Sequence, residues 1–306
     1  MSIQCNSIDV SDYCTQITSN PDISGIGVRL ALYVQALLSM SISSFLWDNE
    51  KAFRDTCRNS YVVSGSLTIA TLIAWATDEL SLFDALITSM LTTLMTTFVA
   101  VNGTYIHSLG LSINLACLIF TSFWCYWGLQ VWANVSTFGL PLGAQNCTAN
   151  EDTRFVVLGH SVHATNGRLR AFAMFIFALG VVSALHALWV TVSWVLRYKY
   201  DGPQESKRDA AEQLARRQRL RQERGRGSQH VVRFGGLVGL IYLIVTTEQM
   251  VAWNPDVSQA LRDWSFGQTL ALIMLAQQIF DCASYIEETR RVRRKQAQHA
   301  SNQSRV

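Results

Sequence analysis

Apolar segments of membrane-spanning length recur along the chain, and they constrain its fold more than any other feature. A helix needs about 20 such residues to cross roughly 30 Å of hydrocarbon, because each residue advances it by about 1.5 Å. The sequence therefore predicts an all-α, polytopic transmembrane bundle of about seven helices. The predicted spans are approximately Ile26–Trp47, Tyr61–Thr77, Leu80–Val101, Ser108–Ala133, Leu169–Leu196, Phe234–Ala252 and Ser265–Ala283.

Charged residues are few and unevenly distributed. They make up 15% of the chain against 49% hydrophobic residues, and most lie at 48–58, 199–233 and 290–295. Lys and Arg beside a span favour the cytoplasmic side. Placing 199–233 in the cytoplasm also places the basic C-terminal tail there, which predicts an N-out, C-in orientation. If the short Tyr61–Thr77 segment does not span, the N-terminus moves to the cytoplasm.

This orientation divides the chain into five regions. Residues 1–25 form an extracellular segment, and no cleaved signal peptide is expected there because a basic region followed by an apolar one is missing. Residues 26–198 carry five spans, with an outer loop at 134–168. A basic cytoplasmic loop (199–233), the last two spans (234–285) and a basic cytoplasmic tail (286–306) follow. We expect the protein in the plasma membrane or a secretory-pathway membrane.

Four polar residues from four spans lie at a similar predicted depth, about one turn from the outer end. They are Arg29, Asp84, Glu248 and Gln268. A charge at the bilayer centre costs about 2.5–3.5 kcal/mol, so such residues usually face the bundle interior. One hypothesis is a polar pocket open to the outside. The alternative is a set of ion pairs and hydrogen bonds that hold the helices together.

A second polar set lies deeper in the membrane. Gln277, Gln278 and Asp281 occupy the inner half of the last span, and His186 in the fifth span could join them. Gln277 and Asp281 are four residues apart and so share a helix face. The set could relay protons or bind a cytoplasmic partner. It could equally join helices through hydrogen bonds of about 0.6 kcal/mol each.

The predicted outer segments carry candidate covalent and metal sites. Asn146 begins an Asn-Cys-Thr glycosylation sequon. The three outer cysteines allow one disulfide, for which Cys14 and Cys147 are the preferred pair. His160 and His163 are three residues apart but have no third ligand nearby, so no metal site or cofactor is expected.

The basic run at 199–233 is rich in helix formers. It can extend the fifth span as a solvated helix. Its basic residues at 207–226 can also contact anionic lipid headgroups, at about 1 kcal/mol each. A cytoplasmic protein partner fits the same run. Nucleic-acid binding is not expected, because no folded soluble module carries the charge. The sequence leaves the oligomeric state open.

Three functions fit these features. The topology favours a receptor-like seven-span sensor, and polar residues at two depths favour a channel or transporter for protons, ions or a small solute. A membrane scaffold without a ligand fits as well. An enzyme is not expected, because the sequence shows neither a nucleophile–base pair nor a metal constellation. None of the four lysines lies mid-span, which excludes a retinal Schiff base.

Two segments resemble a broad group of fungal multi-span proteins of uncharacterised function. These are NPDISGIGVRLALYVQALL (Asn20–Leu38) and EQMVAWNPDVSQALRDWSFGQTLALIM (Glu248–Met274). The resemblance covers the first and last two spans and implies a fungal source and a similar seven-span layout. It also implies that Arg29, Glu248, Asn254 and Gln268 belong to the group's pattern. It implies no activity, substrate or catalytic residue.

Overall fold

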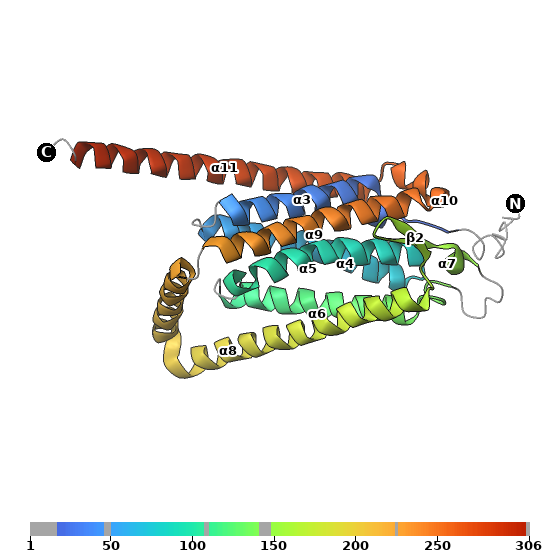
Figure 1. Cartoon of the computed structure of the whole chain (residues 1–306), viewed down its shortest axis with the longest axis horizontal. Coiled ribbons are helices and arrows are strands. Elements are labelled where there is room, and N and C mark those ends of the chain that lie inside the picture. Colours follow the sequence, from blue (N-terminus) through green and yellow to red (C-terminus); the bar gives the residue numbers. More distant parts are fainter. Residues whose placement is uncertain (1–16, 46–49, 107–109, 141–147, 224–225, 304–306) are drawn as a thin grey trace, which may run out of the picture.

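Long helices dominate the computed structural model, which describes residues 17–45, 50–106, 110–140, 148–223 and 226–303 (Figure 1). The long helices in these ranges are α3 (Ile26–Phe45), α4 (Glu50–Ala76), α5 (Leu82–Ile106), α6 (Leu111–Ala133), α8 (Gly167–Glu223), α9 (Arg226–Ala252) and α11 (Phe266–Gln303). The shorter elements are α2 (Pro21–Ser24), α7 (Ala149–Asp152), β1 (Arg154–Val157), β2 (His160–His163), α10 (Pro255–Ser258) and the 3-10 helix η1 (Ala260–Arg262).

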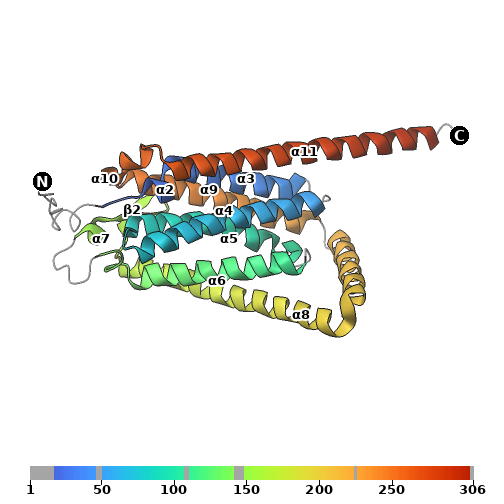
Figure 2. The same ribbon diagram turned by 180° about the vertical axis from the view of Figure 1, so that it is seen from behind.

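The long helices form one bundle with two distinct ends (Figures 1 and 2). One end carries α2, α7, the β1–β2 hairpin and α10, and we call it the hairpin end. At the other end α8 bends and its basic second half runs across the bundle, while α11 projects beyond it; we call this the basic end. The two basic clusters of the sequence therefore lie at the same end, as the predicted topology requires.

Six of the long helices are long and apolar enough to cross a membrane, so the chain is an integral membrane protein with a helical bundle. The exception is α4, whose first turns carry Lys51, Arg54 and Arg58. It is nevertheless packed within the bundle, against α3, α5 and α6. The helical class is confirmed, whereas seven spans and the N-out orientation stay predictions.

The bundle is built around α5. Its side chains Phe83, Leu86, Ile87 and Phe98 are fully buried, and it packs against α3, α4, α6 and α9. In contrast, α8 packs chiefly along α6, and α11 packs along α3. These two helices lie at opposite edges of the bundle in both views (Figures 1 and 2). Their outward faces are apolar and exposed, as a lipid-facing surface requires.

The two basic regions are helical, in agreement with a helix at 199–233 that extends the fifth span. Helix α8 continues to Glu223 and α9 begins at Arg226, while α11 continues through most of the predicted tail. The cause is the high helix propensity of Ala, Glu, Gln, Leu and Arg in these regions. A helix already formed in the membrane also supplies the nucleus, so its extension is cheap.

A β-hairpin stands in the predicted outer loop. Its strands pair antiparallel with Val157 opposite His160. The turn residues Leu158 and Gly159 have φ of 49° and 79°, and two positive φ values give the twist that a two-residue hairpin needs. The amide of Leu158 donates to the Tyr242 hydroxyl at 3.2 Å. The hairpin therefore lies along α9.

Candidate functional site

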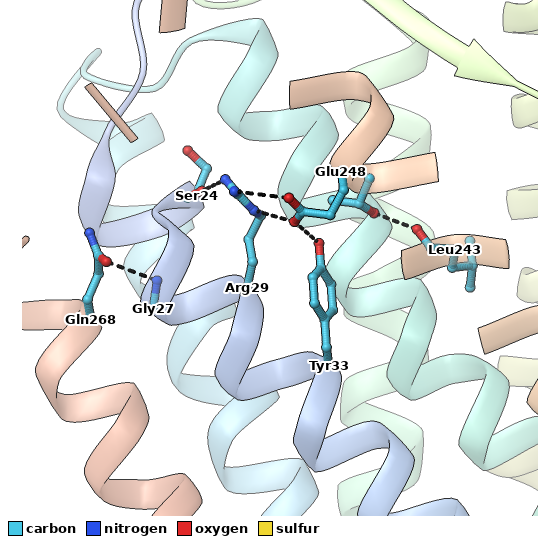
Figure 3. A network of polar contacts seen from close by, with 8 residues as sticks. Ser24, Gly27, Arg29, Tyr33, Leu243, Glu248 and Gln268 are labelled. Carbon is cyan, nitrogen blue, oxygen red and sulfur yellow. Dashed lines mark hydrogen bonds and ion pairs between the residues drawn. The ribbon is translucent and has the colours of Figure 1, made fainter. Parts of the chain in front are cut away.

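An ion pair joins α3 to α9 near the hairpin end (Figure 3). Arg29 Nε lies 2.8 Å from Glu248 Oε1, and Arg29 Nη1 donates to the Ser24 carbonyl at 2.6 Å. The Tyr33 hydroxyl, one turn further along α3, donates to Glu248 Oε1 at 2.8 Å. Only 4% of the Arg29 side chain is exposed, so its charge depends on these partners.

Gln268 joins α11 to the first turn of α3. Its Oε1 accepts from the Gly27 amide at 2.9 Å, and its Nε2 donates to the Asp263 carbonyl at 2.7 Å. A Cβ on Gly27 would lie 2.8 Å from Gln268 Cβ. Glycine at this position therefore permits the close approach of α11.

Asp84 is buried at the start of α5 and accepts hydrogen bonds from three groups. The Asn20 amide donates to Oδ2 at 2.9 Å and the Ser81 hydroxyl donates to the same oxygen at 3.0 Å. The Ser24 hydroxyl donates to Oδ1. Asn20 also caps α2, because its side chain accepts from the Asp22 amide at 3.0 Å. The carboxyl group thus fixes α2 against α5.

A cavity of about 660 Å³ lies beside Asp84 at the hairpin end. Its lining comes from 17–21, 78–84, 138–140 and the α7 region. Below it, the Phe138 ring stacks on Trp75 and meets Trp127 edge-on, with centroids 6.3 and 6.0 Å apart. Trp127, Leu86 and Ile87 are fully buried beneath. The cavity is therefore closed toward the bundle core.

The four residues of the predicted outer pocket divide between these features. Asp84 lines the cavity, whereas Arg29, Glu248 and Gln268 do not. Those three bond to protein groups instead and tie α3 to α9 and α11. The predicted depth correctly places the four residues near one another. It does not predict which side of each helix they lie on, and therefore not whether they line the same cavity. For these three the structure matches the alternative, in which polar groups hold helices together.

The inner polar set forms a second network among α3, α4 and α11. Gln278 is buried and donates to the Ser39 hydroxyl at 3.3 Å, and Ser39 lies 3.0 Å from the Ser60 hydroxyl. Asp281 Oδ2 accepts from Asn59 Nδ2 at 3.3 Å. The Tyr285 hydroxyl donates to Asp55 nearby.

Two members of the predicted inner set lie elsewhere. His186 lies on the exposed side of α8, at the opposite edge of the bundle from α11, and its ring stacks on Trp189 with centroids 6.1 Å apart. Gln277 is exposed, because it lies about 100° around the helix from buried Gln278. The set was grouped by depth alone, and depth does not report direction around a helix.

The candidate covalent sites are outside the described residues. Asn146, Cys14 and Cys147 fall there, so glycosylation and the disulfide stay predictions. His160 and His163 are exposed on β2, and the described residues contain no group of three side chains able to hold a metal ion. The basic side chains at 207–226 are also outside the described set.

Asn254 is a buried polar residue that lies just beyond the end of α9, outside the predicted span. Its Oδ1 accepts from the Arg154 amide and its Nδ2 donates to the Arg154 carbonyl, both at 2.9 Å. Nδ2 also donates to the Met250 carbonyl at 2.6 Å. The side chain thus pairs with β1 as a neighbouring strand would. In the sequence, only the resemblance to the fungal group points to Asn254.

Comparison with known proteins adds no identification: no protein-family model, curated protein or solved structure matches the chain. The resemblance to the fungal multi-span group stays a prediction.

Proposed function

We propose that the protein is a receptor-like membrane sensor that binds a small ligand in the cavity at the hairpin end. The observation that carries this proposal is a cavity of about 660 Å³ that opens at one end of the bundle and is closed below by packed aromatic rings. A volume of this size suits a small organic molecule. A cavity closed below supports sensing over transport.

The lining favours a small organic cation. It contains Asp78, Glu79 and Asp84, and none of the described lining residues is Lys, Arg or His. The Ser19 hydroxyl is buried there without a hydrogen-bond partner among the described residues. Phe138 contributes an aromatic ring to the wall, and the quadrupole of such a ring attracts a cation. We therefore expect an amine or ammonium group attached to an apolar body.

The cavity wall offers a route for a signal. Asn20 and Pro21 line the cavity and belong to the segment that forms α2. Ser24, at the end of α2, bonds to both Asp84 and Arg29, and Arg29 bonds to Glu248 of α9. A ligand that shifts α2 would thus change the contacts of α9, whose first residues lie at the basic end.

In this proposal the basic end passes the signal to the cytoplasm. Residues 207–226 carry the charge that we expect to contact anionic lipid headgroups or a cytoplasmic protein. With the hairpin end outside, the ligand would come from outside the cell or from a lumen. The proposal includes the N-out orientation and a location in the plasma membrane or a secretory-pathway membrane.

The test is thermal stability of the purified protein against a panel of small organic cations. A ligand that binds the folded state raises the unfolding temperature by several degrees at saturation. Ala149→Phe fills the cavity and should abolish the shift. Ala171→Phe adds the same ring on the exposed side of α8 and should retain it. A shift that persists in Ala149→Phe would place the ligand elsewhere and overturn the proposal. Proton or solute flux through parent liposomes would overturn it in favour of transport.

A further inference from the structure

Helix α11 carries an exposed apolar stripe with the spacing of a helix–helix seam. Phe266, Leu270, Ile273, Gln277 and Phe280 follow one another at steps of four, three, four and three residues. Four of them are apolar, with exposed fractions of 76%, 45%, 59% and 72% in chain order. This alternation is the pattern by which two helices pack at about 20° with interlocking side chains.

A glutamine stands in the middle of this stripe. Gln277 is exposed and lies eleven residues after Phe266 and fourteen before Arg291, the limits of the candidate span. Its depth is therefore close to the bilayer centre. No hydrogen bond to its side chain occurs within the described residues, whereas adjacent Gln278 is buried and bonded to Ser39. An amide without a partner in hydrocarbon costs several kcal/mol.

We infer that α11 is a homodimer interface in the membrane, with Gln277 of each copy hydrogen-bonded to Gln277 of the other. A two-fold axis along the membrane normal keeps both copies in the same orientation and places identical residues at the same depth. The amide has both a donor and an acceptor, so two copies satisfy each other. The apolar residues above and below then pack across the axis.

A second copy fits this stripe better than a different partner or lipid alone. Lipid tails can cover Leu270, Ile273 and Phe280, but they offer nothing to an amide at that depth. The stripe carries no charge between Phe266 and Phe280, so it offers no complement to a charged partner helix. Because α11 packs on the bundle through its other face, pairing requires no rearrangement of the contacts to α3.

The test is disulfide crosslinking of the full chain in membranes with a membrane-permeant oxidant. Ile273→Cys is on the stripe. Ile279→Cys is six residues further along α11 and about 120° around the helix from Ile273, and 45% of Ile279 is exposed. Ile273→Cys should give a dimer, several-fold more than Ile279→Cys. Equal yields at the two positions, or a crosslinked product of a mass other than twice the chain, would overturn the inference.

The contribution of the amide is measured separately by subunit counting in liposomes at graded protein-to-lipid ratios. Gln277→Leu should weaken dimerisation about three- to thirtyfold, the range for hydrogen bonds between membrane helices. Gln277→Asn keeps an amide and should retain most of the affinity. The leucine faces lipid or the seam, so folding is not at risk. A parent that remains monomeric, or a leucine variant that dimerises as well as the parent, would contradict the proposal.

Discussion

At the scale of single residues, Arg29 is the charged group that depends most on its partners. Its guanidinium is almost fully buried, and within the described part of the chain its one charged partner is Glu248, whose side chain is 46% exposed. We expect Glu248→Gln to lower the free energy of unfolding by about 2 kcal/mol, less than for a fully buried pair because the carboxylate is half exposed. Replacing both residues with Leu should cost less than Glu248→Gln, since no unpaired charge remains. Unfolding in detergent measures both, and a double variant less stable than the single one would contradict this account.

Asn254 makes a second residue-scale prediction, because it is the only described side chain that bonds to both backbone groups of Arg154. Asn254→Ala should destabilise the hairpin by about 2 kcal/mol, since the Arg154 amide and carbonyl lose their partner. Asn254→Asp keeps the acceptor but turns a carboxylate oxygen toward the Arg154 and Met250 carbonyls, so it should destabilise the hairpin at least as much as Asn254→Ala. Hydrogen exchange of the Arg154 amide is the measurement. Unchanged exchange in Asn254→Ala would show that the docking depends on other contacts.

At the scale of elements, glycines test how closely α6 and α8 pack. A Cβ on Gly128 would lie 2.1 Å from a ring carbon of Phe177, whereas one on Gly235 of α9 meets nothing within 4 Å. Gly128→Ala should therefore destabilise the bundle by about 1–3 kcal/mol. Gly235→Ala should be neutral or slightly stabilising, because alanine favours the helix. Thermal unfolding of the two variants side by side makes the comparison, and equal stabilities would argue against close packing at this seam.

Element positions were predictable from sequence, but helix faces were not. The length of apolar segments located each long helix, because hydrocarbon thickness sets that length. The same apolar character conceals which side of a membrane helix faces protein, since lipid and core both accept Leu and Phe. Gln277 and Gln278 were therefore indistinguishable, as were Gly235 and Gly236, although a Cβ on Gly236 alone would meet Val101 and Met40.

The polar residues of the candidate site were predictable from the sequence, but their partners were not. Arg29, Glu248, Asp84 and Gln268 were found because polar groups in a span need partners. Their pairing depends on α2, a single turn at 21–24 that no apolar period reveals. The hairpin escaped prediction because its docking depends on Asn254, 100 residues from Arg154. Contacts over such separations are set by the tertiary fold and leave no local pattern.

At the scale of the whole molecule, successive long helices run in opposite directions, so each connection lies at one end of the bundle. The α4–α5 turn carries exposed Glu79 at the hairpin end, and Gln259 is exposed beside α10 at the same end. Lys51 at the start of α4 and Arg294 near the end of α11 lie toward the basic end. If α4 spans the membrane, these pairs are on opposite sides of it.

Single cysteines at these four positions test that arrangement with a membrane-impermeant maleimide on intact cells. Cys5, Cys14 and Cys147 are replaced by Ser, and the remaining four cysteines are buried. We expect Glu79→Cys and Gln259→Cys to react in intact cells, and Lys51→Cys and Arg294→Cys to react only after permeabilisation, because the basic end should stay in the cytoplasm. The reverse pattern would invert the orientation. Reaction of Lys51→Cys from outside together with Glu79→Cys would show that α4 does not cross the bilayer, and the bundle would then have six spans.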